Sequence, residues 1–332
     1  MTPIDQLNDE IIEMKHYLFQ KQFPIMGVMM NFMTSSKDAI HLVEQRFEHW
    51  LDLPEHMIRP GPSMLIRINA LPNTKMESIT DKVQFKIENE ILTGKGFGLD
   101  LQVDRKSGFA EVWIDSDVLK LTSFFTHDIL GAIVRFLVFS RDRVPLHAST
   151  IIRNETGLIL CGRSGSGKST LSYQLLKRGA DILSESAVFI ASEDQYRLWG
   201  DVQEIYLRPD ARNLFPELAR YPDKRLPNGK IKIPVQLPII GTHNQRRLYF
   251  SGSMHLILLE KSDSAKSDLV KVPHHDVIEK LNSERESGFD LSDKFLETMN
   301  NLPVTNTYVL NSGNDLIYKA ELLENLCEKQ II

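Results

Sequence analysis

The sequence predicts an α/β protein of two domains: a smaller α+β domain over residues 1–140 and a mixed sheet with flanking helices over residues 141–332. The first reason is length, because 332 residues are about twice the ~150 expected of one domain. The second is that short alternating apolar runs dominate before residue 115, whereas strand-like and helical patterns alternate after residue 140. The third is composition: 42% hydrophobic and 25% charged residues are ordinary globular values, which exclude a disordered, collagen-like or coiled-coil chain.

Charge and cysteine content narrow the functional class. The net charge of −5, from 39 basic and 44 acidic residues, predicts no binding to nucleic acid or to an anionic membrane through overall charge. Cys161 and Cys327 lie outside any Cys-x-x-Cys or Cys/His cluster, so neither a zinc site nor a disulfide framework is expected. The N-terminus lacks a secretory pattern, and the most apolar run, 129–139, is 11 residues long, whereas a membrane span needs about 20. We therefore expect a soluble, cytoplasmic protein.

The first 140 residues carry the pattern of an α+β domain. Ser35 and Ser36 precede a helical pattern, and either is a candidate N-cap. Alternating apolar runs predict half-buried antiparallel strands. The expected elements are a helix near 4–19, a strand at 25–32, a helix at 36–51, strands at 64–68, 83–87 and 110–114, and a helix at 126–140.

Strands and helices alternate again in the second domain. Two strands joined by the turn 153–156 come first, and each later strand is followed by helical periodicity. The expected elements are strands at 147–152 and 157–161, a strand at 254–259, helices at 275–282 and 292–300, a strand at 308–310 and a helix at 314–328.

Residues 209–241 interrupt this alternation. Six prolines in this segment predict a long irregular loop, and long loops in compact domains are often functional lids. Arg208 and Lys230, the latter beside Gly229, are candidates for phosphate or substrate contacts, with solvated surface charge as the alternative. The basic residues gathered here are Arg208, Arg212, Arg220, Lys224, Arg225, Lys230 and Lys232.

The strongest motif is a glycine-rich segment at 162–169. It matches G-x-x-x-x-G-K-[ST] at every fixed position, after an apolar strand at 158–160 and before a helical pattern that Gly179 ends. In this context the backbone N–H groups and the helix N-terminus bind nucleotide phosphates. The residues predicted to bind are Gly162, Arg163, Ser164, Gly165, Ser166, Gly167, Lys168, Ser169 and Thr170.

Two side chains of the motif have specific roles. Lys168 is placed to reach the β- and γ-phosphates as a point charge, and the Ser169 hydroxyl is placed to bind Mg²⁺. The motif predicts nucleotide binding, but it does not by itself define the reaction.

Other nucleotide-binding classes can be compared with the sequence. No Asn-Lys-x-Asp motif of a small GTPase is found, and residues 250–253 match the signature loop of an ABC-type ATPase poorly. The strand 256–260 ends in Glu260, which is typical of a Walker B acid but equally of a buried strand followed by an exposed or capping Glu. An ATPase that uses Glu260 to drive movement or assembly is therefore one candidate function.

The residues around the glycine loop resemble a known family. A strand with His147 precedes the loop by one hairpin, and Arg178-Gly179 and the acidic Glu185 follow it before another strand. Over about 144–190 this order resembles the C-terminal catalytic domain of HPr kinase/phosphorylase and HPr-kinase-like P-loop kinases. The resemblance implies a P-loop kinase domain preceded by a smaller variable domain for recognition or assembly. It also implies ATP and Mg²⁺ as cofactors, and transfer of the γ-phosphoryl group to a serine hydroxyl.

The resemblance also assigns site residues. His147 corresponds to the histidine that precedes the family's P-loop, and Glu185 and Ser186 stand where the family has two adjacent aspartates. Glu185 would bind the metal together with Ser169 and accept the proton of the attacking hydroxyl, with Asp181 as the alternative base. The candidate catalytic residues are thus Glu185, His147 and Lys168. Because Ser186 carries no negative charge at neutral pH, a non-catalytic nucleotide-binding module is a second candidate function.

The acceptor is not specified by the motifs. A peptide, a small protein or a small molecule is expected, including a ribosomal precursor peptide, since relatives of this kind are found beside peptide-modification gene sets. The family enzyme is a ring-like oligomer. Because the N-terminal domain of this chain is different, we do not transfer that oligomeric state, and a homo-oligomer is one open alternative.

Overall fold

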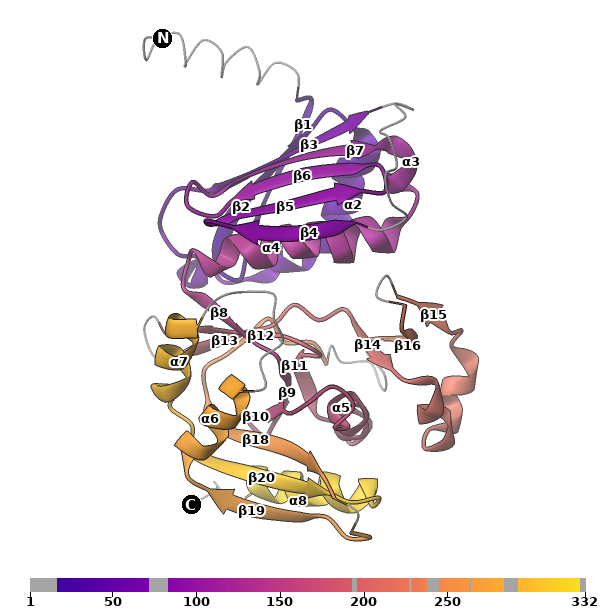
Figure 1. Cartoon of the computed structure of the whole chain (residues 1–332), viewed down its shortest axis with the longest axis vertical. Helices are drawn as coiled ribbons and strands as arrows, with labels where there is room; N and C mark the ends of the chain where they lie inside the picture. The colour runs from indigo at the N-terminus through magenta and orange to yellow at the C-terminus, as the bar shows by residue number, and fades with distance from the viewer. Residues whose placement is uncertain are drawn as a thin grey trace. The chain divides into compact units, whose positions relative to one another are not determined.

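The structure is a computed structural model that describes residues 17–71, 83–192, 196–226, 229–237, 245–262, 264–283 and 292–328. The chain forms two compact units, Met1–Arg141 and Asp142–Ile332, drawn from indigo to magenta and from magenta to yellow in Figure 1. Both combine sheets and helices, so the mixed α/β architecture predicted from the sequence is confirmed. The helix predicted at 4–19 falls largely outside the described residues, and its last residue is the first of a strand.

The first unit is built on a seven-stranded mixed sheet of order β1-β2-β3-β7-β6-β5-β4. Buried and partly exposed residues alternate along its strands, because one face of the sheet packs against helices. The elements are β1 (Phe19–Ile25), β2 (Val28–Thr34), α2 (Lys37–Phe47), β3 (Met64–Leu71), β4 (Gln84–Glu88), β5 (Ile91–Gly96), β6 (Leu99–Asp104), β7 (Phe109–Asp115), α3 (Ser116–Leu119) and α4 (Leu130–Phe139), with short 3₁₀ turns at Glu48–Asp52 and Glu55–Met57 and a π-helical turn at Phe124–Ile129.

Several predictions for this unit are wrong in detail. The strand expected at 25–32 is the hairpin β1–β2, which turns at Met26 and Gly27 with positive φ angles of 51° and 74°. An unbroken apolar run hides this turn. Strand β3 pairs in parallel with both β2 and β7 rather than antiparallel, and β5 and β6 were not predicted. Of the two candidate caps, Ser36 caps α2, because its Oγ accepts from the Ala39 N–H at 3.2 Å.

In the described ranges, the second unit contains three sheets. The largest has the order β11-β9-β10-β18-β20-β19, and the others are β17-β13-β12-β8 and β14-β16-β15. The elements are β8 (Arg143–Leu146), β9 (Ser149–Arg153), β10 (Thr156–Cys161), α5 (Lys168–Lys177), β11 (Asp181–Ser184), β12 (Val188–Ala191), β13 (Arg197–Trp199), β14 (Glu204–Leu207), β15 (Lys224–Arg225), β16 (Ile231–Gln236), β17 (Tyr249–Phe250), β18 (Ser253–Lys261), β19 (Asp268–Val272), α6 (His274–Ser283), α7 (Ser292–Asn300), β20 (Asn306–Ser312) and α8 (Leu316–Glu328), with 3₁₀ turns at Pro209–Asn213 and Pro216–Arg220.

Helix α5 lies in the main core of this unit. Its buried leucines pack with residues from β10 and β18 of the large sheet, from α8, and from the β14–β16 pair. The glycine loop directly precedes α5 and is therefore supported by well-packed elements on both sides. The core residues contributed by these elements are Leu158, Leu160, Leu171, Leu175, Leu176, Ile205, Leu207, Ile233, Val235, Ile257, Leu259, Ala320 and Leu323.

The prediction that 209–241 is irregular is wrong for the strands β15 and β16, whereas residues 209–223 hold only short 3₁₀ turns. Strand β16 pairs with β14 on one side and with β15 on the other. Ile233 and Val235 alternate into the core, and the gain from burying them outweighs the proline between them. Pro234 is tolerated because β15 ends opposite Lys232, so β16 has only one partner strand at the proline.

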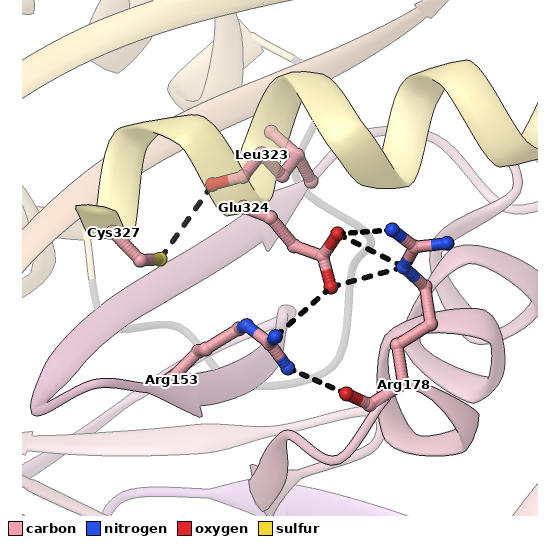
Figure 2. A network of polar contacts seen from close by, with 5 residues as sticks. All are labelled: Arg153, Arg178, Leu323, Glu324 and Cys327. Carbon is pink, nitrogen blue, oxygen red and sulfur yellow. Dashed lines mark hydrogen bonds and ion pairs between the residues drawn. The ribbon is translucent and has the colours of Figure 1, made fainter. Parts of the chain in front are cut away.

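Glu324 of α8 connects three elements of this core (Figure 2). Its carboxylate accepts from Arg178, just after α5, at 2.6 and 2.9 Å, and lies 3.5 Å from a guanidinium nitrogen of Arg153. Arg153, at the end of β9, also donates to the Arg178 carbonyl at 2.6 Å, which satisfies a free acceptor at the end of α5. The Glu324 side chain is only 8% exposed, so its charge depends on these two arginines.

We expect Glu324→Gln to destabilise the second unit by about 2 kcal/mol, between the values for exposed and buried ion pairs, because both arginines are partly exposed. This corresponds to a fall in Tm of about 5 °C for a unit of this size. Thermal unfolding of the full chain, followed by circular dichroism, measures this fall. The control is Glu328→Gln, an exposed residue of the same helix, and equal Tm values for the two variants would contradict the prediction.

Candidate nucleotide site

The glycine loop joins the buried strand β10 to helix α5, as the sequence predicts. Strand β10 runs parallel to β18, and the two strand ends approach closely at Gly162. A Cβ atom on Gly162 would lie 2.6 Å from the Leu259 carbonyl oxygen, and the φ angle of 135° also favours glycine. This glycine therefore lets the loop leave the sheet directly beside β18.

Lys168 lies against the loop that it follows. Its side chain is buried, and Nζ donates to the carbonyl of Gly162 at 2.5 Å and to that of Arg163 at 3.3 Å. Ser166 is also buried, and its Oγ has no hydrogen-bond partner in the described part of the chain. A buried hydroxyl without a partner is costly, so an ammonium and an unsatisfied hydroxyl at this loop fit the phosphate oxygens of a nucleotide.

A carboxylate from another element reaches the start of α5. The Ser169 hydroxyl donates to Oε1 of Glu185 at 2.7 Å, and Glu185 lies between β11 and β12. Burial raises the pKa of Glu185, whereas the hydrogen bond from Ser169, the charge of Lys232 and a hydrogen bond with Ser186 oppose that rise. Hydroxyl and carboxylate oxygens are ligands that Mg²⁺ accepts in nucleotide sites, so this pair fits the metal.

Arg208 follows β14 and reaches the glycine loop. A Cβ atom on Gly165 would lie 2.7 Å from Nη2 of Arg208, so the absence of a side chain on Gly165 makes room for the guanidinium. Arg208 is exposed. Its guanidinium group lies beside the glycine loop at Gly165.

Lys232 is a site residue that the sequence did not single out. It is half-buried on β16, and burial lowers its pKa, the nearby charge of Glu185 raises it, and the charges of Arg208 and Lys230 lower it further. Lys232 thus lies within electrostatic reach of Glu185, Arg208 and Lys230. Ile231, Ile233 and Val235 stand at every second position. This alternation was the sequence signal that Lys232 lies on a strand.

Two other residues predicted for the site, His147 and Asp181, have surroundings different from those of Glu185. His147 is exposed in the two-residue link between β8 and β9, which belong to different sheets. Asp181, the alternative base, pairs with Arg247 at 2.7 Å and lies at the start of β11, whereas Glu185 follows its end. Strand geometry separates the two ends of β11 by about 10 Å, so Glu185 is the carboxylate that the fold brings to Ser169.

Glu260 lies at the end of β18 and forms an ion pair with Lys280 of α6. Alternation along β18 places it on the face opposite to Ile257 and Leu259, which pack in the core with α5. The candidate Walker B carboxylate therefore has a partner from α6 and faces away from the side on which α5 packs.

Two features are absent from the described residues. No three His, Cys, Asp or Glu side chains in this part of the chain gather as a set that could hold a metal by themselves. None of the helices in the same ranges combines the length and apolar character of a membrane-spanning helix.

A strand, a glycine loop and a helix that begins with Lys168 and Ser169 define the P-loop class of nucleotide-binding site. No family model matches the chain. Among curated proteins, HPr kinase/phosphorylase of Streptococcus thermophilus is 32% identical over 66 residues, 20% of this chain and 21% of the relative. That of Streptococcus gordonii is 33% identical over 64 residues, 19% and 21% of the two chains. The predicted resemblance to HPr kinase/phosphorylase is thus confirmed, and the matched segment spans about a fifth of these relatives' length.

A solved structure is also similar to this chain. The HPr(Ser) kinase/phosphatase from Coxiella burnetii is matched over 55% of this chain and 89% of its own, with 15% sequence identity and a TM-score of 0.28. A TM-score this low does not define a shared arrangement of elements.

Proposed function

We propose that this chain is an ATP-dependent kinase that transfers the γ-phosphoryl group of ATP to a serine hydroxyl of a peptide, a small protein or a small molecule. The observation that carries the proposal is the 2.7 Å contact between Ser169, in the first turn of α5, and Glu185, from beyond β11. Phosphoryl transfer needs phosphate binding, metal ligation and a proton acceptor in one place. The P-loop and this contact together supply residues of each kind.

The chain's own groups would bind and neutralise the phosphates. The backbone N–H groups of residues 162–170 and the ammonium of Lys168 would contact the nucleotide phosphates. Arg208, Lys230 and Lys232 add positive charge around the same loop. Mg²⁺, held by Ser169 and Glu185, would supply charge neutralisation across the β- and γ-phosphate oxygens when bound.

Glu185 is proposed to act on the proton of the acceptor. As the serine oxygen forms its bond to the γ-phosphorus, the bond from phosphorus to the bridging oxygen of ADP breaks, and a Glu185 oxygen accepts the hydroxyl proton. Glu185 is partly buried, and this burial raises the pKa of its carboxyl group, which favours proton acceptance. His147 is proposed, from the family resemblance, to act near the phosphates.

The serine hydroxyl as acceptor is taken from the resemblance to HPr kinase/phosphorylase. The name of the relatives, HPr kinase/phosphorylase, gives HPr as the protein they act on, but the matched segment covers only a fifth of their length. For this chain we propose a serine-bearing peptide, including a precursor peptide of a modification pathway, a small protein or a small molecule. The first unit is proposed to serve recognition or assembly, in a cytoplasmic protein.

The test is mass spectrometry of candidate acceptors after incubation with the full chain, ATP and Mg²⁺. The expected result is a phosphorylated serine that requires both the protein and Mg²⁺. ATP binding without turnover for any acceptor would instead identify the non-catalytic module. Hydrolysis that is independent of acceptor and is lost in Glu260→Gln would identify the ATPase.

We expect Arg208→Ala to raise the KM for ATP about tenfold, because one charge-assisted contact to phosphate is worth about 1.5 kcal/mol. The matched control is Arg225→Ala, which removes an exposed arginine of β15 in the same small sheet. Initial rates at varied ATP concentrations measure both variants. Equal KM values for the two would remove Arg208 from the site.

A further inference from the structure

Three serine hydroxyls form a buried cluster behind the candidate site. Ser149 of β9, Ser172 of α5 and Ser184 of β11 are 0%, 0% and 1% exposed. The Ser149 and Ser172 hydroxyl oxygens are 2.7 Å apart, and Ser149 Oγ donates to the Ser184 carbonyl at 3.0 Å. Ser184 Oγ in turn donates to the Ala148 carbonyl at 3.1 Å. The cluster therefore joins two strands and the P-loop helix through direct hydrogen bonds.

The direction of each hydrogen bond follows from proton counting. The Ser184 carbonyl can only accept, so the single proton of Ser149 is used there. The Ser172 hydroxyl must then donate to Ser149. Each hydroxyl proton in the cluster thus has one acceptor, and Ser149 is the only member bonded to both other elements. Removing its oxygen would break the hydrogen-bonded link that runs through the cluster from α5 to β11.

The cluster lies where the regular pairing of β9 and β11 is interrupted. The register between these strands shifts between Ile182 and Ser184, and such irregularities redirect the side chains that follow them. At this point the two serine hydroxyls bond across the strands in both directions. The residue after Ser184 is Glu185, and the residue two before Ser149 is His147.

The helix end of the cluster is equally close to the site. Ser172 is three residues after Ser169 on α5, so the two lie one turn apart. Two neighbouring contacts thus connect α5 with β11 and the residue that follows it. One is the hydrogen bond between Ser169 and Glu185, and the other is the serine cluster.

We propose that the Ser149–Ser172–Ser184 cluster is a positioning device that sets the distance between the P-loop helix and the strand end carrying Glu185. The proposal rests on the proposed function for its effect on catalysis. Its members touch no substrate, so they act through Glu185 and Ser169. Because displacements of about 1 Å lower the rate of a positioned reaction by up to 10²-fold, a loosened cluster should affect kcat more than nucleotide binding.

The test compares Ser149→Ala with Thr150→Val in the full chain. Thr150 is the neighbouring residue of β9, also 0% exposed, and its Oγ1 has no hydrogen-bond partner in the described ranges. Both variants remove one buried hydroxyl from one strand, but only Ser149→Ala removes bonds. We expect kcat to fall about tenfold in Ser149→Ala with a smaller rise in KM for ATP in Mg²⁺, about threefold, and both to stay near wild type in Thr150→Val.

A second variant separates positioning from loss of stability. Ser172→Ala leaves the bond between Ser149 and Ser184 in place, so we expect a smaller fall in kcat, about threefold. The kinetics are measured well below the Tm of each variant. If Ser149→Ala keeps wild-type kcat, or if kcat falls equally in Thr150→Val, the positioning role is refuted.

A binding measurement keeps this inference separate from the proposed function. If the wild-type chain phosphorylates no acceptor, the kinase proposal fails, but the relative placement of Ser169 and Glu185 can still be read from Mg²⁺-dependent ATP affinity. Calorimetric titration with ATP, in Mg²⁺ and in EDTA, should show that the Mg²⁺-dependent gain is reduced in Ser149→Ala and retained in Thr150→Val. The same gain in both variants would overturn the inference.

Discussion

Replacing Lys168 by alanine is expected to reduce phosphoryl transfer by about 10³-fold, because a positioned charge on the transferring phosphoryl group is worth about 4 kcal/mol in the transition state. ATP binding should weaken as well, since the same ammonium would contact the phosphates before the reaction. In the described structure this ammonium is bonded to the Gly162 and Arg163 carbonyls of the loop. Transfer of label from γ-labelled ATP and calorimetric ATP binding measure the two effects.

The control for Lys168→Ala is Lys177→Ala on the same helix. Lys177 lies in the last turn of α5 and forms an ion pair with Glu217, so its loss removes a lysine of α5 without changing the loop. We expect its transfer rate to stay within about twofold of wild type. Retention of wild-type transfer by Lys168→Ala would contradict the proposed P-loop chemistry.

Glu185→Gln is expected to reduce transfer by about 10²- to 10³-fold, because general-base catalysis typically contributes 10²–10⁴-fold. Glutamine keeps the size of the side chain and an oxygen that can accept from Ser169, so the packing around β11 should persist. The charge that would hold Mg²⁺ is lost, so we expect ADP binding in EDTA to change little and the Mg²⁺-dependent gain in ATP affinity to fall. Single-turnover transfer and calorimetry measure these two quantities.

Asp181→Asn is the matched variant for this assignment. Asp181 is the alternative carboxylate in sequence, but it pairs with Arg247 at the other end of β11. We expect this variant to keep its transfer rate when it is assayed below its Tm. Loss of transfer in Asp181→Asn together with full transfer in Glu185→Gln would reverse the assignment of the base.

The P-loop was predictable from the sequence because its function is local. The strand, the loop and the start of α5 are consecutive, so the spacing of Gly162, Gly167 and Lys168 already predicts the strand, loop and helix that the structure shows. The N-cap of α2 is local in the same sense, although choosing Ser36 over Ser35 required the observed hydrogen bond. The resemblance to HPr kinase/phosphorylase also came from residues close to this loop.

Strand geometry was harder to predict where local signals conflict. The β1–β2 hairpin turns inside an apolar run, so burial conceals a turn that Met26 and Gly27 make with left-handed backbone angles. In the proline-rich segment, the turn signals of the prolines favoured a loop, but the alternation of Ile231, Ile233 and Val235 formed β16. This segment forms a strand because one face of it, with Ile233 and Val235, packs in the core that α5 and the large sheet provide.

The sequence by itself therefore determined the P-loop, its lysine and serine, and the mixed α/β character of the chain, because these depend on residues that are neighbours along the backbone. Only the tertiary structure decided that Arg208 reaches Gly165, that Lys232 joins the cations beside Glu185, and that three buried serines connect β9, α5 and β11. Each of these contacts joins separate elements whose relative placement is set by packing of the shared core, and packing is a property of the whole fold rather than of any one segment.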